Sequence, residues 1–184
     1  MNILLFKKLG TYLVLSLSLY TVNAESNQSR TQANVTVFDG YCFQNYDSYN
    51  NIKYMVEAVG GKAIPEKLIN GDPVMRKLGG SAYSIILEKK MYIIGYAENA
   101  ACSVMTKSFE SDDVVRLLND FYSMKLIQKD TNGMQVTEMY EIINDSTHNG
   151  AILSVVYAKK NSGIDVGTIS FLPAKTIKKT LNNK

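Results

Sequence analysis

Cys42 and His148 are the two residues of this 184-residue chain whose side chains could together attack a substrate. The chain has two cysteines, Cys42 and Cys102, and His148 is its one histidine. A cysteine on an N-terminal helix, followed by a histidine on a later sheet, is the order found in papain-like cysteine hydrolases, where the histidine activates the thiol. One hypothesis for the chain is therefore a cysteine hydrolase that uses Cys42 and His148.

The sequence around both residues argues against this chemistry. Cys42 lies in FDGYCFQ, residues 38–44, which lacks the small residues that normally flank such a nucleophile. His148 lies in STHNG, residues 146–150, a turn-rich stretch in which we expect a solvated imidazole that no third group orients. We therefore predict that the protein is not an enzyme and has no catalytic residues, with the papain-like hydrolase as the alternative.

The same two cysteines have a structural use. An exported chain with just two cysteines most often contains one disulfide. Cys42 falls on a helical stripe with Phe38 and Tyr46, and Cys102 shares a strand face with Val104. Because a helix that rests on a sheet brings two such inward positions together, we predict a disulfide between Cys42 and Cys102.

Other chemistries lack the residues that they need. Zinc sites use closely spaced cysteines and histidines, whereas the cysteines here are about sixty residues apart and there is one histidine. The stretch VGGK, residues 59–62, lacks the glycine spacing and the following Ser or Thr of a phosphate-binding loop. We therefore predict neither a metal nor a cofactor.

The first 24 residues, MNILLFKKLGTYLVLSLSLYTVNA, have the three parts of a secretory signal peptide. Lys7 and Lys8 form the positive region, residues 9–22 are apolar, and Ala24 is the small residue at the cleavage point. A transmembrane anchor would need about 20 strongly apolar residues, whereas serines and threonines interrupt this stretch. We predict cleavage after Ala24, a periplasmic location, and no stable membrane insertion once the signal is removed.

Removing this signal changes the charge of the chain. The whole sequence has 20 basic and 17 acidic residues, a net charge of +3. Residues 1–24 contain two lysines and no acids, which leaves 18 basic and 17 acidic residues, a net charge of +1. Since nucleic-acid binding needs a concentrated basic face, we predict no nucleic-acid partner. The partner should be a protein or a small-molecule ligand of the envelope.

The remaining chain has the length of one domain. Residues 25–34 are polar and lack periodicity, which predicts a flexible leader. Residues 35–175 should form a single domain, followed by a basic tail over 176–184. Apolar residues that recur every three or four positions predict one broken helix or two short helices over 34–59.

Two further short helices are predicted near 65–69 and 73–78, where proline suits a first turn. A longer one is predicted over 111–125, with Ser111 as its N-cap. Its buried stripe should consist of four apolar residues: Val114, Leu117, Leu118 and Phe121.

From residue 82 onward, outside the helix predicted over 111–125, the helical period is lost, and stretches rich in Ile, Tyr and other apolar residues, separated by short polar or turn-rich breaks, predict strands. The strand-like stretches are residues 82–88, 91–98, 101–107, 134–143, 150–160 and 165–172. Short turns between successive strands imply antiparallel pairing. The predicted fold is α+β, an antiparallel sheet of about six strands with N-terminal helices and one central helix packed on one face.

Five tyrosines fall in these predicted strands: Tyr83, Tyr92, Tyr96, Tyr140 and Tyr157. A sheet face rich in tyrosine could bind a ligand or a partner. Aromatic residues also simply suit strands, and we favour this packing interpretation.

A combination of local features carries a resemblance. Phe38 stands four residues before the helical Cys42, Gly80 to Tyr83 form a Gly-x-Ala-aromatic entry into a strand, and Val104 follows two residues after Cys102. Over about residues 35–125 the chain resembles a family of small exported proteobacterial proteins with two cysteines and unknown function. The resemblance implies a periplasmic protein with paired cysteines, and it carries over no functional site.

The sequence therefore predicts a soluble periplasmic protein that binds or interacts rather than catalyses. An immunity-type protein, which neutralises a toxic enzyme in the periplasm, is its most concrete form.

Overall fold

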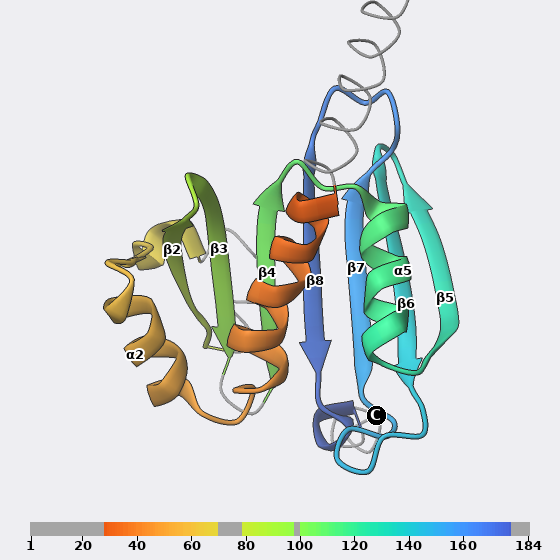
Figure 1. Ribbon diagram of the computed structural model, residues 1–184, viewed down its shortest axis with the longest axis horizontal. Coiled ribbons are helices and arrows are strands. Elements are labelled where there is room, and N and C mark those ends of the chain that lie inside the picture. The colour runs from red at the N-terminus through yellow and green to blue at the C-terminus, as the bar shows by residue number, and fades with distance from the viewer. Residues whose placement is uncertain (1–27, 70–78, 98–99, 178–184) are drawn as a thin grey trace, which may run out of the picture.

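An eight-stranded antiparallel sheet is the scaffold of the computed structural model, which describes residues 28–69, 79–97 and 100–177 (Figure 1). The strand order is β1-β2-β3-β4-β8-β7-β6-β5. The strands are β1 (Lys62–Ala63), β2 (Ser81–Leu87), β3 (Lys90–Ala97), β4 (Ala101–Lys107), β5 (Met124–Asn132), β6 (Gln135–Ile142), β7 (Ile152–Ala158) and β8 (Val166–Leu172). The predicted α+β class is confirmed, with eight strands in place of six.

The two strands that the sequence analysis missed lie at the two edges of the sheet. β1 has only two residues, and β5 begins at Met124, inside the stretch predicted to be the end of a helix. Every residue of β5 after Met124 is exposed, so its sequence lacks the alternation that marks a half-buried strand. Pairing with β6 defines this strand, and that pairing is not visible in the local sequence.

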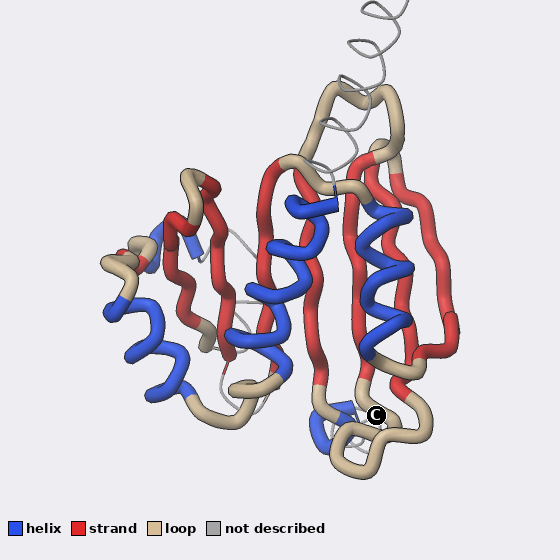
Figure 2. Tube along the Cα trace, in the orientation of Figure 1, coloured by secondary structure: helices blue, strands red, loops and turns tan. Residues whose placement is uncertain are grey.

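The three longer helices, residues 28–38, 49–58 and 111–121, lie against one face of the sheet, as Figure 2 shows in blue. Residues 28–38 are α-helical and continue into a π-helical turn, η1 (Asp39–Phe43). The helices α2 (Tyr49–Ala58), α3 (Glu66–Ile69) and α5 (Ser111–Phe121) follow, and residues 174–177 are also helical. The predicted break in the N-terminal helical region is therefore present, and the Ser48 hydroxyl accepts the Asn51 N–H at the start of α2.

Three local expectations differ from the structure. Residues 28–34, predicted to be part of a flexible leader, are helical because Thr31 and Asn34 are buried against the sheet. Ser111 is the first residue of α5 rather than its N-cap, which is Glu110. Phe121, predicted to be part of the buried stripe, is 58% exposed, whereas Val114 and Leu118 are fully buried. The signal peptide and the helix predicted over 73–78 lie outside the described residues.

The core lies between the helices and the sheet. The neighbouring strands β4 and β8 lie at the centre of the sheet. Their pairing places Cys102 opposite Phe171. The side chains that point toward the helices are almost fully buried, among them Tyr92, Ile94 and Leu153. Gly167 in β8 leaves room for the ring of Phe109, because a Cβ at this position would lie 2.1 Å from Phe109 Cγ.

Candidate functional site

Cys42 and Cys102 form a disulfide, as the sequence predicted. Their Cα atoms are 5.2 Å apart, and the bond joins the π-helical turn η1 to β4 across 60 positions of sequence. Both residues belong to the hydrophobic core, with relative exposures of 0% and 1%. The chain therefore has no free thiol.

His148 lies in the loop between β6 and β7, but it is not solvated as the sequence analysis expected. Its side chain is 14% exposed. The imidazole packs on Phe43, with ring centroids 4.3 Å apart, and lies edge-on to Phe171 at 5.6 Å. Contacts with these two rings, which are distant in sequence, explain why the imidazole is largely shielded, and local turn composition cannot reveal them.

A carboxylate accompanies this imidazole. His148 Nδ1 lies 3.2 Å from Asp145 Oδ1. The backbone N–H groups of His148 and Thr147 also donate to Asp145 and lower the pKa of its carboxyl group. His148 is thus oriented by a third group, and Phe43 follows Cys42 directly in the chain. Even so, Cys42 has no thiolate to offer while its sulfur is bonded to Cys102.

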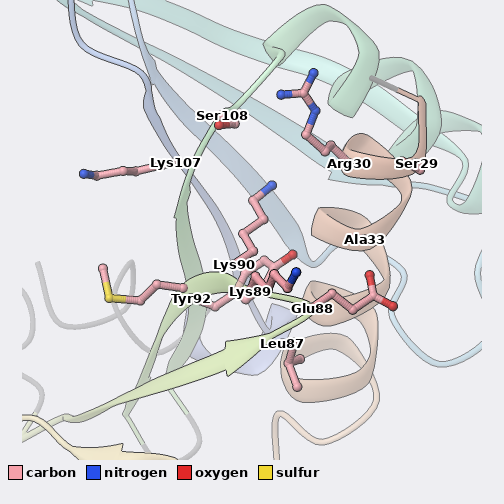
Figure 3. A pocket seen from close by; sticks show the side chains of 11 residues that line it. Ser29, Arg30, Ala33, Leu87, Glu88, Lys89, Lys90, Tyr92, Lys107 and Ser108 are labelled. Atoms are coloured by element: carbon pink, nitrogen blue, oxygen red, sulfur yellow. The ribbon is translucent and has the colours of Figure 1, made fainter. Parts of the chain in front are cut away.

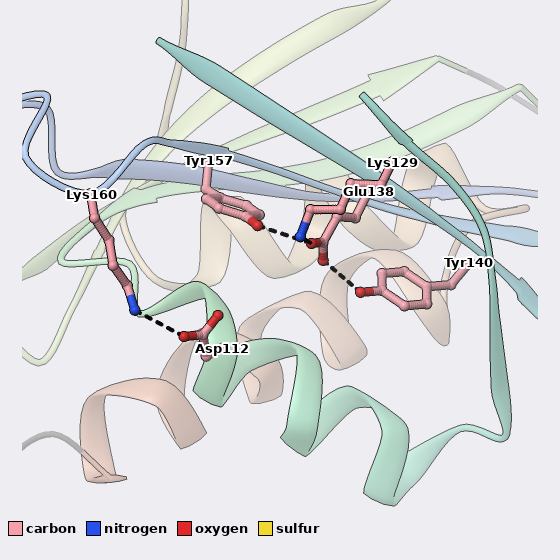
Figure 4. Close-up of polar contacts among 6 residues, drawn as sticks. All are labelled: Asp112, Lys129, Glu138, Tyr140, Tyr157 and Lys160. Carbon is pink, nitrogen blue, oxygen red and sulfur yellow. Dashed lines mark hydrogen bonds and ion pairs between the residues drawn. The ribbon is translucent and has the colours of Figure 1, made fainter. Parts of the chain in front are cut away.

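A buried charged cluster that the sequence analysis did not find surrounds Glu138 in β6, which is 7% exposed (Figure 4). The hydroxyl of Tyr140 donates to Glu138 Oε2 at 2.5 Å, and that of Tyr157 donates to Oε1 at 2.9 Å. Lys129 in β5 places its Nζ 2.6 Å from the same Oε1. The carboxylate is therefore paired with one cation and bonded to two hydroxyls.

The pKa values follow from this geometry. Burial alone would raise the pKa of Glu138, but the hydrogen bonds from Lys129, Tyr140 and Tyr157 outweigh it and lower the pKa. Burial and the bond to Glu138 raise the pKa of Tyr140 and that of Tyr157. The glutamate is therefore ionised and both tyrosines are neutral at neutral pH, which suits an internal structural network.

A signal for this cluster was present in the sequence. Val136, Glu138, Tyr140 and Ile142 occupy alternate positions of β6 and are all buried. A glutamate at a position that alternates with buried apolar residues must itself be buried. It requires partners, because an unpaired buried carboxylate is costly. The direct cross-strand partner of Glu138 is Lys129 in β5. The sequence of β5 does not mark it as a strand, so this pairing could not be predicted.

The five strand tyrosines do not form an open binding surface. Tyr83, Tyr92, Tyr96 and Tyr140 are each at most 8% exposed on the helix-covered side of the sheet. Tyr157 lies two residues after the buried Val155 in β7, so the two side chains are on the same side of the sheet. The packing interpretation is therefore the one that the structure supports: four of the tyrosines belong to the core and Tyr157 packs against it.

The part of the chain that the structure describes contains no group of three or more His, Cys, Asp or Glu residues placed to hold a metal ion. In the same residues, none of the helices has the length and apolar character needed to cross a membrane. Comparison of the chain with protein-family models, with curated proteins and with solved structures gives no significant match.

Proposed function

We propose that this chain is an exported binding protein of the cell envelope, without catalytic activity, whose core is tied together by one disulfide. The observation that carries the proposal is the Cys42–Cys102 bond, which lies in the hydrophobic core. Disulfides persist in oxidising compartments such as the bacterial periplasm and are rare in the cytosol. The bond therefore agrees with the signal-like N-terminus in the sequence.

The absence of a thiolate supports a binding role over the papain-like alternative. Such a hydrolase needs a reduced, partly exposed cysteine beside a histidine. Cys42 is oxidised and has a relative exposure of 0%. The pairing of His148 with Asp145 is the feature that keeps the alternative worth testing.

The partner is a protein or a small ligand of the envelope. An immunity-type role would place the gene beside that of a secreted toxic enzyme, whereas a ligand-binding role would place it among genes of transport or metabolism. This genomic observation separates the two forms of the proposal.

Export itself is tested by expressing the full chain in a Gram-negative host and measuring the intact mass of the periplasmic product. We expect a chain that begins at Glu25 and is about two mass units lighter than the fully reduced form, because a disulfide removes two hydrogens. A product that keeps residues 1–24, or that stays in the cytoplasmic fraction, would contradict the proposal.

A further inference from the structure

A cavity of about 500 Å³ opens between the helix of residues 28–38 and the turn that joins β2 to β3 (Figure 3). Glu88 and Lys89 both have positive φ, 49° and 64°, and they reverse the chain in two residues. Lys90 therefore stands at the first position of β3, beside the helix. Lys107 and Ser108, at the end of β4, complete the wall.

Positive charge is concentrated around this cavity. Its lining includes four basic residues and one acidic residue, Glu88, for a net charge of +3. The basic residues are Arg30, Lys89, Lys90 and Lys107. The predicted mature chain has a net charge of only +1. The fold therefore brings together basic residues that are distant in sequence. A concave site with an excess of one sign of charge attracts an incoming ion of the opposite sign.

Lys90 is held in place within the cavity. Its Nζ donates to Asn34 Oδ1 at 2.6 Å and lies 5.6 Å from the centroid of the Tyr92 ring. None of the ion pairs among the described residues involves Lys90. An ammonium group has three N–H donors, and the bond to Asn34 uses one. Lys90 can therefore donate to a further acceptor without losing its anchor.

Arg30 lies one helical turn before Asn34, so the two side chains share one side of the helix. In Figure 3 the side chain of Lys90 extends from the hairpin toward the helix that carries Arg30, whereas Lys107 extends away from it. Burial lowers the pKa of Lys90, and the charge of Arg30 lowers it further, while Asp165 acts in the opposite direction. Two cations close to each other at an open cavity repel, and an anion bound beside them would offset that repulsion.

We propose that this cavity binds the phosphate group of a small ligand or lipid headgroup, with Lys90 and Arg30 as its two cationic contacts. Arginine binds phosphate through a planar fork and lysine as a point charge, and the two are common phosphate partners in proteins. The cavity is larger than one phosphate group, which leaves room for the rest of a small ligand. The inference rests on the proposed binding function and deepens it by naming a ligand class.

The test is a titration of the isotope-labelled mature protein with inorganic phosphate, followed by amide NMR shifts. We expect saturable shifts confined to residues 29–34, 88–92 and 107–108. Because charge-assisted hydrogen bonds are stronger than neutral ones, Lys90→Gln and Arg30→Gln should each raise the Kd about tenfold or more. Lys125→Gln, which removes the same charge from the exposed edge strand β5, should leave the Kd unchanged.

Co-sedimentation with vesicles separates the two sources of phosphate. Binding to phosphatidylglycerol vesicles but not to phosphatidylcholine vesicles, lost in Arg30→Gln, would identify a lipid headgroup. Saturable phosphate binding without vesicle binding would identify a free phosphate-bearing ligand. Absence of both kinds of binding, or equal binding by all three variants, would overturn the inference.

Two features keep this test decisive. Arg30 is exposed, so Arg30→Gln reports on binding even if Lys90→Gln unfolds the protein by breaking the bond to Asn34. Failure to bind phosphate would leave the disulfide and the export result untouched. The ligand class and the proposed function can therefore fail separately.

Discussion

Replacing Cys42 and Cys102 together by alanine is expected to lower the free energy of unfolding by about 4 kcal/mol. The bond closes a loop of 60 residues, and cross-linking a loop of this length removes much of the conformational entropy of the unfolded chain. It also joins the N-terminal helical region to the central strand β4. Loss of the disulfide therefore weakens the attachment of the N-terminal helical region to the sheet.

Thermal unfolding of the mature protein measures this effect. A loss of this size corresponds to a fall in Tm of about 8 °C or more, at about 2–4 °C per kcal/mol for a chain of this length. The wild-type protein unfolded in the presence of a reductant serves as the control and should show a similar fall. A double variant with an unchanged Tm would show that the bond adds nothing to the stability of the core.

Replacing Glu138 by alanine is expected to cost about 3 kcal/mol of stability at neutral pH, because the buried hydroxyl of Tyr140 and the partly buried hydroxyl of Tyr157 lose their acceptor. Lys129 is 54% exposed and can return to water, so the loss stays below that of a fully buried ion pair. Asp112→Asn is the matched control. Its partner is Lys160 in an ion pair exposed on both sides, and we expect little change (Figure 4).

The contribution of Glu138 to stability should depend on pH. Because the folded-state pKa of Glu138 is lowered, its ionised form stabilises the protein above the unfolded pKa of about 4.3. That stabilisation should be lost as the pH falls through the lower, folded-state value. The difference in stability between wild type and Glu138→Gln, measured by urea unfolding, should therefore be largest near pH 7 and shrink below pH 4. A difference that stays constant from pH 7 to pH 3 would contradict an ionised buried carboxylate.

The sequence allowed the fold class, most of the strands and the disulfide to be predicted. Alternation in β6, the richness of β2 and β3 in Ile and Tyr, and the helical spacing around Cys42 are local signals of strands and of a buried helix face. Pairing of Cys42 with Cys102 followed because both lie at inward positions and the chain has no other cysteine.

The features that could not be predicted depend on contacts between distant segments. β5 is a strand only because β6 pairs with it, and Lys129 meets Glu138 only through that register. His148 is only 14% exposed because its ring packs against Phe43 and Phe171, although its own neighbours in sequence are turn residues. The basic cavity likewise combines Arg30, Lys90 and Lys107, which no run of sequence brings together.

Cys42 is one half of a structural disulfide rather than a nucleophile. Alkylation of the native, unreduced mature protein with iodoacetamide, followed by intact-mass analysis, tests it directly. We predict no added mass before reduction and two alkyl groups after reduction and unfolding, because both sulfurs are bonded and buried in the native state. Rapid addition of a single group at Cys42 in the native protein would contradict the claim and favour the hydrolase that uses Cys42 and His148.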